Sequence, residues 1–108
     1  MYYQGDIIEV SFDPSRGHEA EKTLPAVVLG CNRFNQMSNV SIVAPITSTD
    51  NKYPLHIAIA PQNAVHGYIC LEHLASLDLS ARKCQTLGSL DPLTMTQVLD
   101  ALGAIFDI

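Results

Sequence analysis

The chain reads GDIIEVSF over residues 5–12, DPSRGHEAEKTL over residues 13–24 and PAVVLG over residues 25–30. The first run alternates in the two-residue period of a β-strand, which places three apolar side chains on one face: Ile8, Val10 and Phe12. The third run contains the continuous apolar stretch of a short buried strand, whereas the middle run collects Pro, Gly and charged residues. These residues therefore predict two strands that hold a polar loop between them, an arrangement in which a rigid scaffold presents a site.

Further apolar runs follow along the chain at residues 40–46, 56–60 and 68–71, each bounded by Pro, Gly or Asn. Short strands separated by turn residues predict a compact, mainly β fold, in which an antiparallel sheet curls towards a barrel. Pro45 lies near the end of one run. Because proline cannot donate to a sheet ladder, Pro45 marks an edge, a bulge or the end of the strand. We expect the backbone to turn out of the sheet there, which places residues 47–49 on a loop.

The last part of the chain has the pattern of an α-helix. Asp91 is a good N-cap, and Pro92 suits the first helical position. Apolar residues then recur with helical spacing at Met95, Val98, Leu99, Leu102, Ile105 and Phe106. We expect this stripe to pack on the sheet, and a shorter helical turn to form at residues 79–82.

The length and composition indicate one soluble domain. A chain of 108 residues with 47% hydrophobic and 16% charged residues can bury a single core. It has no stretch approaching the roughly 18 apolar residues of a membrane helix, and the N-terminus does not resemble a signal peptide. We therefore expect a cytoplasmic protein with no membrane partner.

The net charge of −5 argues against broad, unspecific binding to nucleic acid, which depends on many lysine and arginine contacts to phosphate. The chain has six basic residues: Arg16, Lys22, Arg33, Lys52, Arg82 and Lys83. Several of them fall in predicted loops, so the sequence still allows a local basic patch. The acidic surface serves either solubility or a partner with basic segments.

The loop at residues 13–19 is the first candidate site. In a functional interpretation, His18 and Glu19 act as acid or base groups, and Arg16 contacts a phosphate. The alternative is an ordinary hairpin turn, since Pro, Gly, Asp and Ser are also the residues that turns require. Residue types alone leave both interpretations open.

Two more polar groups follow predicted strands. The hydroxyls of Thr47 and Ser48 come just after one strand and could bind phosphate oxygens, or belong to an ordinary Ser/Thr-rich loop. Glu72 and His73 follow another strand, either in a binding groove or as solvated residues at a strand end.

Metal and cysteine chemistry are not expected from the spacing. His56, His66 and His73 lack close ligand spacing and form no H-E-x-x-H motif, so we expect no metal ion and no other cofactor. The three cysteines include no C-x-x-C pair. Cys31 and Cys70 adjoin apolar runs, which predicts small buried thiols rather than nucleophiles.

Taken in order, these segments resemble the MazF/PemK family of toxin endoribonucleases. The resemblance covers almost the whole chain, and its motifs keep the order and spacing of the family: GDI at 5–7, FDPxxGHE at 12–19, PAVVL at 25–29, VxPIT at 43–47, GYxxLEH at 67–73 and LDxxAR at 77–82. Each motif is weak by itself, whereas the ordered set is fairly specific.

The resemblance implies a small SH3-like β-barrel with a C-terminal helix that forms a homodimer. It also implies the toxin of a type II toxin–antitoxin pair, which cuts single-stranded mRNA at short sequences and is silenced by a MazE/PemI-like antitoxin peptide. In this family the 2′-hydroxyl of the RNA attacks the adjacent phosphate without a metal ion, leaving a cyclic phosphate and a 5′-hydroxyl. Such a reaction needs a base, an acid and positive charge at the phosphate.

Carried over by position, the resemblance assigns catalytic roles to Thr47, which would hydrogen-bond the phosphate, and to Glu19, the loop carboxylate. The family's catalytic arginine stands immediately before the proline matched by Pro25, where this chain has Leu24. A second basic residue of the family is replaced by Ala75. The residues expected to contact RNA are Arg16, His18, Lys22, Ser48 and His73.

Leu24 decides how far the family's chemistry carries over. A missing guanidinium costs on the order of a hundredfold in rate when it stabilises a transition-state phosphate. Lys22 faces the same side of an extended chain and could supply a point charge, and Arg16 is the other local substitute. Three alternatives stay open: an active enzyme with a relocated cation, a naturally weakened toxin, or a variant altered to be tolerated by its expression host.

The rival hypothesis is a non-catalytic binding module on the same scaffold, which engages an antitoxin peptide or a protein target. The missing cations at Leu24 and Ala75 and the acidic net charge favour it.

Overall fold

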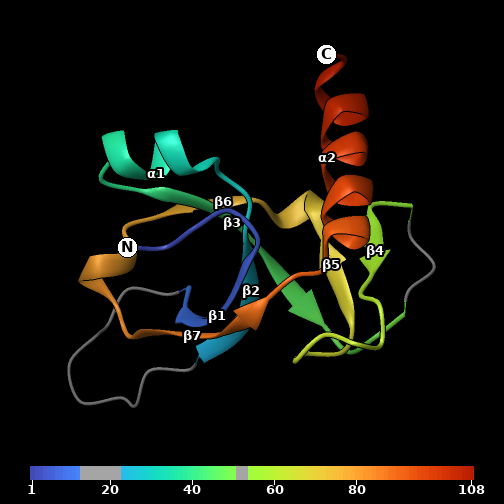
Figure 1. The fold of residues 1–108 in the computed structure, drawn as a ribbon, viewed down its shortest axis with the longest axis horizontal. Coiled ribbons are helices and arrows are strands. Elements are labelled where there is room, and N and C mark those ends of the chain that lie inside the picture. The colour runs from blue at the N-terminus through green and yellow to red at the C-terminus, as the bar shows by residue number, and fades with distance from the viewer. Residues whose placement is uncertain (13–22, 51–53) are drawn as a thin grey trace.

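The computed structural model describes residues 1–12, 23–50 and 54–108. In this part of the chain, one antiparallel sheet has the strand order β4-β5-β3-β2-β1-β7, and β6 pairs with β3 (Figure 1). The strands are β1 (Asp6–Ser11), β2 (Thr23–Val28), β3 (Ser41–Thr47), β4 (His56–Ala58), β5 (Tyr68–Cys70), β6 (Ala75–Leu77) and β7 (Cys84–Ser89). The helices are α1 (Asn32–Met37) and α2 (Pro92–Phe106), and the 3₁₀ turns are η1 (Leu71–His73) and η2 (Leu79–Ala81).

The mainly β fold with a C-terminal helix is confirmed, and each predicted apolar run overlaps one of the strands β1 to β5. The sequence missed β7 because this strand is mostly exposed and shows no apolar alternation. It pairs along β1, which supplies a partner that no local pattern reveals. The segment after Cys31 forms the short helix α1, which has no buried residue.

The prediction that the strand ends at Pro45 is wrong, because Pro45 lies inside β3. On one edge Pro45 is opposite Ala26 of β2. On the other edge β6 pairs with residues 41–43 and β5 pairs with residues 46–47, so the proline falls where β3 changes partner. The missing N–H of proline therefore costs no ladder bond on that edge. Thr47 is consequently the last residue of β3 rather than a loop residue, and Ser48 follows it.

The central strands are apolar on both faces. Ile8 and Val10 lie in one buried cluster with Phe12 packed against it, as the alternation predicted. Ile7 points to the second cluster, which includes Val98 of α2. The sheet is thus covered by α2 on one side, where the helix lies beside β4 (Figure 1).

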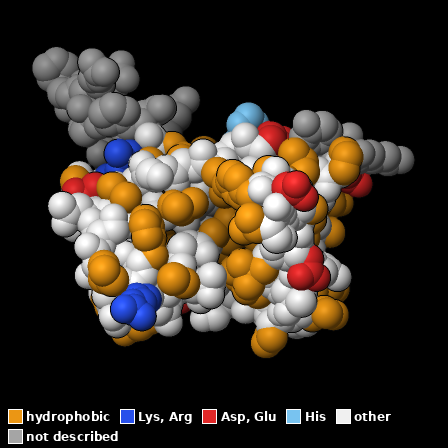
Figure 2. Space-filling view, turned by 90° about the horizontal axis from the view of Figure 1, so that it is seen from above, with side chains coloured by type: hydrophobic (Ala, Val, Ile, Leu, Met, Phe, Trp, Pro, Cys, Tyr) orange, Lys and Arg blue, Asp and Glu red, His pale blue; other side chains and the backbone are white. Residues whose placement is uncertain are grey.

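The helix α2 begins as predicted, but its apolar stripe packs only in part. Val98 is fully buried, and Met95 and Leu102 pack against the core. The expectation that the whole stripe packs on the sheet is wrong for Leu99, Ile105 and Phe106, which are exposed. Figure 2 looks onto the C-terminal end of this helix and shows hydrophobic side chains spread over that face. No helix in the described ranges is both long enough and apolar enough to cross a bilayer.

The N-cap of α2 makes the stability of the protein depend on acidity. Hydrogen bonds from Thr94 and then from Asn63 lower the pKa of Asp91 to about 2. The carboxylate of Asp91 accepts from the backbone N–H of Thr94 at 3.0 Å and from the Asn63 amide at 2.8 Å. Because the folded pKa lies below that of the unfolded chain, this contribution is present above about pH 4 and is lost as the pH falls towards 2.

We therefore expect Asp91→Asn to flatten the fall of the free energy of unfolding between about pH 4 and pH 2. Urea unfolding at a series of pH values measures this slope. Asp100→Asn removes a carboxylate from the same helix but leaves the cap intact, and it should keep the wild-type slope. Equal slopes for wild type and Asp91→Asn would contradict the role of the cap.

Candidate functional site

Thr47 lies at the end of β3 with its side chain partly exposed. Its backbone is opposite Tyr68 of β5, which fixes its position in the sheet. The Thr47 hydroxyl oxygen accepts a hydrogen bond from the backbone N–H of Thr49 at 3.2 Å, so the chain turns directly after the strand. A hydroxyl that accepts one bond keeps its own proton for a further acceptor. Thr47 can therefore donate to an anionic oxygen while Ser48 is exposed beside it.

Gly67 allows β5 to approach Thr47 closely. Its φ of +137° lies in the region that favours glycine, and an added Cβ would lie 2.4 Å from the carbonyl oxygen of Thr47. A glycine is therefore required directly before Tyr68. It lets the backbone of residue 67 lie against the carbonyl of Thr47, and Tyr68 can then pair with Thr47.

We expect Gly67→Ala to destabilise the protein by about 3 kcal/mol, because it combines backbone strain with a clash against main chain that cannot move aside. Chemical denaturation measures the change. Gly103→Ala is the matched control, since an alanine there meets only ordinary contact at 3.4 Å inside α2 and should stabilise slightly. Similar effects of the two substitutions would contradict the close approach at Thr47.

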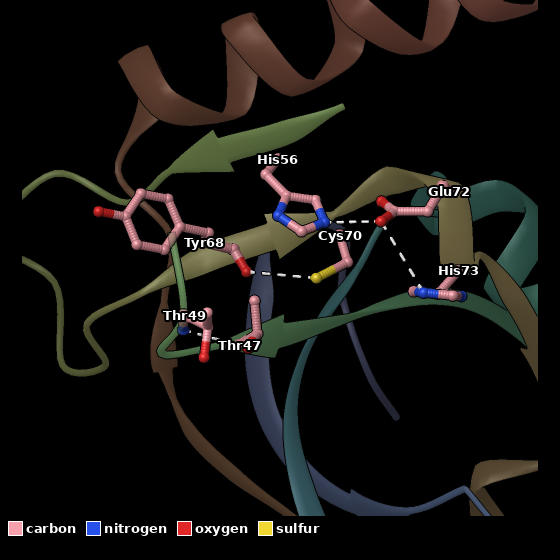
Figure 3. Close-up of polar contacts among 7 residues, drawn as sticks. All are labelled: Thr47, Thr49, His56, Tyr68, Cys70, Glu72 and His73. Atoms are coloured by element: carbon pink, nitrogen blue, oxygen red, sulfur yellow. Dashed lines mark hydrogen bonds and ion pairs between the residues drawn. The ribbon is translucent and has the colours of Figure 1, made fainter. Parts of the chain in front are cut away.

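One face of the β3–β5–β4 region collects polar and titratable side chains (Figure 3). Thr47 is opposite Tyr68, and His56 of β4 is opposite Cys70 of β5. Because side chains alternate along a strand, these residues share a face. The intervening positions point the other way into the core: Ile46, Ile57 and Ile69.

Glu72 lies between two histidines. Its Oε2 is 2.6 Å from Nε2 of His56 and 3.8 Å from Nε2 of His73. Desolvation alone would raise the pKa of Glu72, but a hydrogen bond from its own backbone N–H and the bond with His56 outweigh it and lower the pKa. The side chain of His56 is 4% exposed and that of His73 is 68% exposed. His56 therefore anchors the carboxylate, and His73 is accessible to a ligand.

The cysteines differ from the prediction in one case. Cys70 is buried as expected, and desolvation, then the negative charge of Glu72, raises the pKa of its thiol. Cys31 is exposed, so its predicted burial is wrong. It directly precedes α1, which carries no buried residue and places this segment on the surface.

Leu24 occupies the second position of β2 and is 47% exposed, which is unusual for an aliphatic residue paired with a buried partner, Val10. From Ala26 to Val28, β2 pairs with β3 in the order Pro45 to Val43. Continuing this register by two residues would bring Leu24 opposite Thr47. The predicted cation position and the predicted catalytic threonine thus belong to neighbouring ends of adjacent strands.

Four of the predicted site residues lie outside the described residues: Arg16, His18, Glu19 and Lys22. They belong to the segment between β1 and β2. Thr47, Ser48, Leu24 and His73 are described, and the geometry given above applies to them.

Sequence reasoning missed Arg82, which holds the end of β1. Its Nη1 donates to the carbonyl oxygens of Ser11 at 2.9 Å and of Phe12 at 3.1 Å. Arg82 thereby fixes the point at which the polar segment leaves the sheet. Arg82 was included among the six basic residues and at the end of the LDxxAR motif, but its contact with Ser11, 71 positions away in the sequence, leaves no local signal.

A surface pocket of about 480 Å³ lies elsewhere in the molecule, lined by Tyr2, Asn35, Ser41 and Asp78 among others. Ser41 begins β3 and Thr47 ends it, so the pocket and the predicted site lie at opposite ends of this strand. The pocket therefore adds nothing to the candidate site.

Comparison with known proteins identifies relatives over the whole length. Residues 3–106 match the family described as PemK-like, MazF-like toxin of type II toxin–antitoxin system. The chain is 32% identical over 114 residues to the endoribonuclease toxin ChpB of Escherichia coli K12, covering 98% of this chain and 95% of ChpB. It is 30% identical over 88 residues to the endoribonuclease toxin MazF of the same strain, covering 82% of this chain and 78% of MazF.

Solved structures share the fold. A MazE–MazF crystal structure from Deinococcus radiodurans (Form-II) superposes with a TM-score of 0.85 and 25% identity, covering 99% of this chain and 96% of the other. An endoribonuclease from a mycobacterial species in complex with its cognate antitoxin superposes with a TM-score of 0.83 at 18% identity, covering 100% and 97%.

Proposed function

Because the chain belongs to the PemK-like, MazF-like family of toxins from type II toxin–antitoxin systems, we propose that it is the toxin of such a pair and cleaves single-stranded RNA at short sequences without a metal ion. The observation that carries this proposal is the family match over residues 3–106, together with relatives that are themselves named endoribonuclease toxins. The position of Thr47, with a free proton to donate at an exposed strand end, supports it.

The proposed reaction divides among groups on two parts of the chain. Thr47 donates its hydroxyl proton to a non-bridging oxygen of the scissile phosphate. Glu19 takes the proton of the attacking 2′-hydroxyl as the 2′-oxygen bonds to phosphorus. His18, next to Glu19 in the sequence, contacts the RNA and gives a proton to the 5′-oxygen as the bond from phosphorus to that oxygen breaks. Arg16 and Lys22 supply positive charge from the same segment. Ser48 and His73 contact the RNA on either side of Thr47, and Glu72 orients His73.

Leu24 makes this reaction slow. An aliphatic side chain offers no hydrogen-bond donor to the crowded phosphate, and Lys22 lacks the fork geometry of arginine. We therefore propose a weakened ribonuclease rather than a fully active one.

Incubation of the purified protein and of Leu24→Arg with single-stranded RNA in EDTA tests the proposal. We expect slow cutting at a few sites by the wild type and faster cutting at the same sites by Leu24→Arg. A duplex of the same sequence serves as the control and should stay intact. If neither protein cuts the single strand, the ribonuclease proposal fails.

We further propose that the toxin is a cytoplasmic homodimer neutralised by an antitoxin peptide. The exposed apolar side chains of α2 support a second copy as the occupant of that face: Leu93, Leu99, Ile105 and Phe106. Sedimentation equilibrium distinguishes a dimer from the 11.8 kDa monomer. A strictly monomeric protein at micromolar concentration would contradict the dimer.

The second candidate function is a non-catalytic toxin or binding module that engages an antitoxin peptide or a protein target. The exposed Leu24 and the net charge of −5 favour it. A pull-down from the native host that recovers one small partner, with no RNA cleavage even by Leu24→Arg, would support this function over the first.

A further inference from the structure

Three chemically different side chains converge where β4 and β5 pair. His56 of β4 is directly opposite Cys70 of β5, and Glu72 follows two residues later in η1. The imidazole, the thiol and the carboxylate each offer one donor atom, and these atoms all lie within 4.8 Å of one another. Figure 3 shows His56 and Glu72 facing each other, with Cys70 beside them and its sulfur directed at the Tyr68 carbonyl oxygen, 3.8 Å away.

The backbone holds these donors in place. The N–H of Leu71 donates to the carbonyl oxygen of Leu55 at 3.0 Å, and the N–H of Ile59 donates to that of Gly67 at 3.0 Å, so both ends of the β4–β5 pair are fixed. Cys70 is buried and the His56 side chain is 4% exposed, whereas the Glu72 side chain is 23% exposed. A preorganised set of donors with one solvated edge gives an ion an entry path.

The mixture of donors selects among cations. Magnesium and calcium take oxygen ligands, so a thiol and an imidazole exclude them as the preferred ions. Sulfur, nitrogen and carboxylate oxygen together are typical of zinc, which binds them in a tetrahedron. We propose that His56, Cys70 and Glu72 bind a zinc ion, with water or His73 in the fourth position.

Small side-chain movements are sufficient for this geometry. Ligand atoms on one tetrahedral zinc ion lie about 3.3 to 3.8 Å apart. The His56–Glu72 pair must therefore open from 2.6 Å by about 1 Å, which a rotation of the partly exposed Glu72 provides. His73 is 3.8 Å from Glu72 and exposed, so it can turn towards the ion. The Cys70 proton leaves to solvent when the sulfur binds, since zinc takes the thiolate.

The site adjoins the proposed RNA contact and shares Glu72 with it, but His56, Cys70 and Glu72 carry no proton in the proposed reaction. Thr47 is opposite Tyr68 of β5, two residues before Cys70. A zinc ion would stabilise the β4–β5–η1 corner next to Thr47 in the absence of RNA. Binding therefore goes beyond the proposed function, and it is testable whether or not the protein cuts RNA.

Cobalt(II) is the probe, because it replaces zinc and reports a bound thiolate by a charge-transfer band in the near ultraviolet. We expect the reduced, chelator-treated full-length protein to bind one cobalt ion with that band and to release it when zinc is added. Cys70→Ser should abolish the band, and Glu72→Gln should weaken affinity by about tenfold or more. Cys31→Ser is the matched control, since Cys31 is exposed and distant in sequence from the other ligands, and it should behave as wild type.

Folding is followed separately by circular dichroism and thermal unfolding. Zinc at a hundred times its Kd should raise the Tm of wild type and Cys31→Ser by several degrees and leave that of Cys70→Ser unchanged. The partly exposed Glu72 makes Glu72→Gln a folded variant should Cys70→Ser fail to fold. Absence of the band in wild type, or its loss in Cys31→Ser with retention in Cys70→Ser, overturns the proposal and leaves His56 and Glu72 as a hydrogen-bonded pair only.

Discussion

Leu24→Arg should raise the rate of single-stranded RNA cleavage by about a hundredfold. The side chain at this position is 47% exposed on β2, so an arginine there displaces no core packing. Continuation of the β2–β3 register brings it opposite Thr47, where a guanidinium could hold two phosphate oxygens at once. Single-turnover cleavage in EDTA, with the protein in excess over a labelled RNA, measures the rate.

Two further substitutions at the same position separate charge from bulk. Leu24→Met keeps an apolar side chain of similar size and should leave the rate unchanged. Leu24→Lys supplies charge without the planar fork and should fall between Leu24→Met and Leu24→Arg. If Leu24→Arg cuts no faster than Leu24→Met, this position does not face the scissile phosphate.

Thr47→Val, introduced into Leu24→Arg, should lower the cleavage rate on the order of a hundredfold. Valine keeps the β-branched shape at the end of β3 and removes the hydroxyl, which would hydrogen-bond the phosphate and which accepts from the Thr49 N–H. The same assay measures the loss, and circular dichroism checks that the variant is folded.

Thr47→Ser is the control for this loss, because it retains the hydroxyl and the hydrogen bond from the Thr49 N–H. It should keep most of the activity. A Thr47→Val protein as fast as its Leu24→Arg parent would remove Thr47 from the reaction.

The parts of the fold that could be predicted are those determined by residues close together in the sequence. The alternation of Ile8 and Val10 identified β1 and its buried face, and Asp91 with Pro92 identified the start of α2. Pro45 was misplaced because its effect depends on which strands flank it, and β3 changes partner at that residue. The strand β7 was missed because pairing with β1, rather than its own pattern, makes it a strand.

The candidate site likewise contains residues that sequence motifs predict and residues that only strand pairing brings together. The catalytic role of Thr47 was predicted from the resemblance of short motifs to the family. The structure adds a steric reason for Gly67 in the GYxxLEH motif, because a side chain there would clash with the carbonyl oxygen of Thr47. His56 and Glu72 are 16 residues apart in sequence and meet only because the β4–β5 pair closes. A search for ligands at close spacing compares histidines with one another. It overlooks a histidine whose neighbours are a thiol on the opposite strand and a carboxylate in the turn that follows that strand.

The chemistry of the RNA ends tests the central claim most directly. Leu24→Arg is incubated in EDTA with an RNA that carries one mapped cleavage site, and with the same RNA lacking the 2′-hydroxyl on the nucleotide 5′ to the cut. Attack by that hydroxyl predicts a 2′,3′-cyclic phosphate and a 5′-hydroxyl from the first RNA, and no cleavage of the second. Cleavage of the 2′-deoxy substrate, or products with a 5′-phosphate that form only when a metal ion is supplied, would contradict the account.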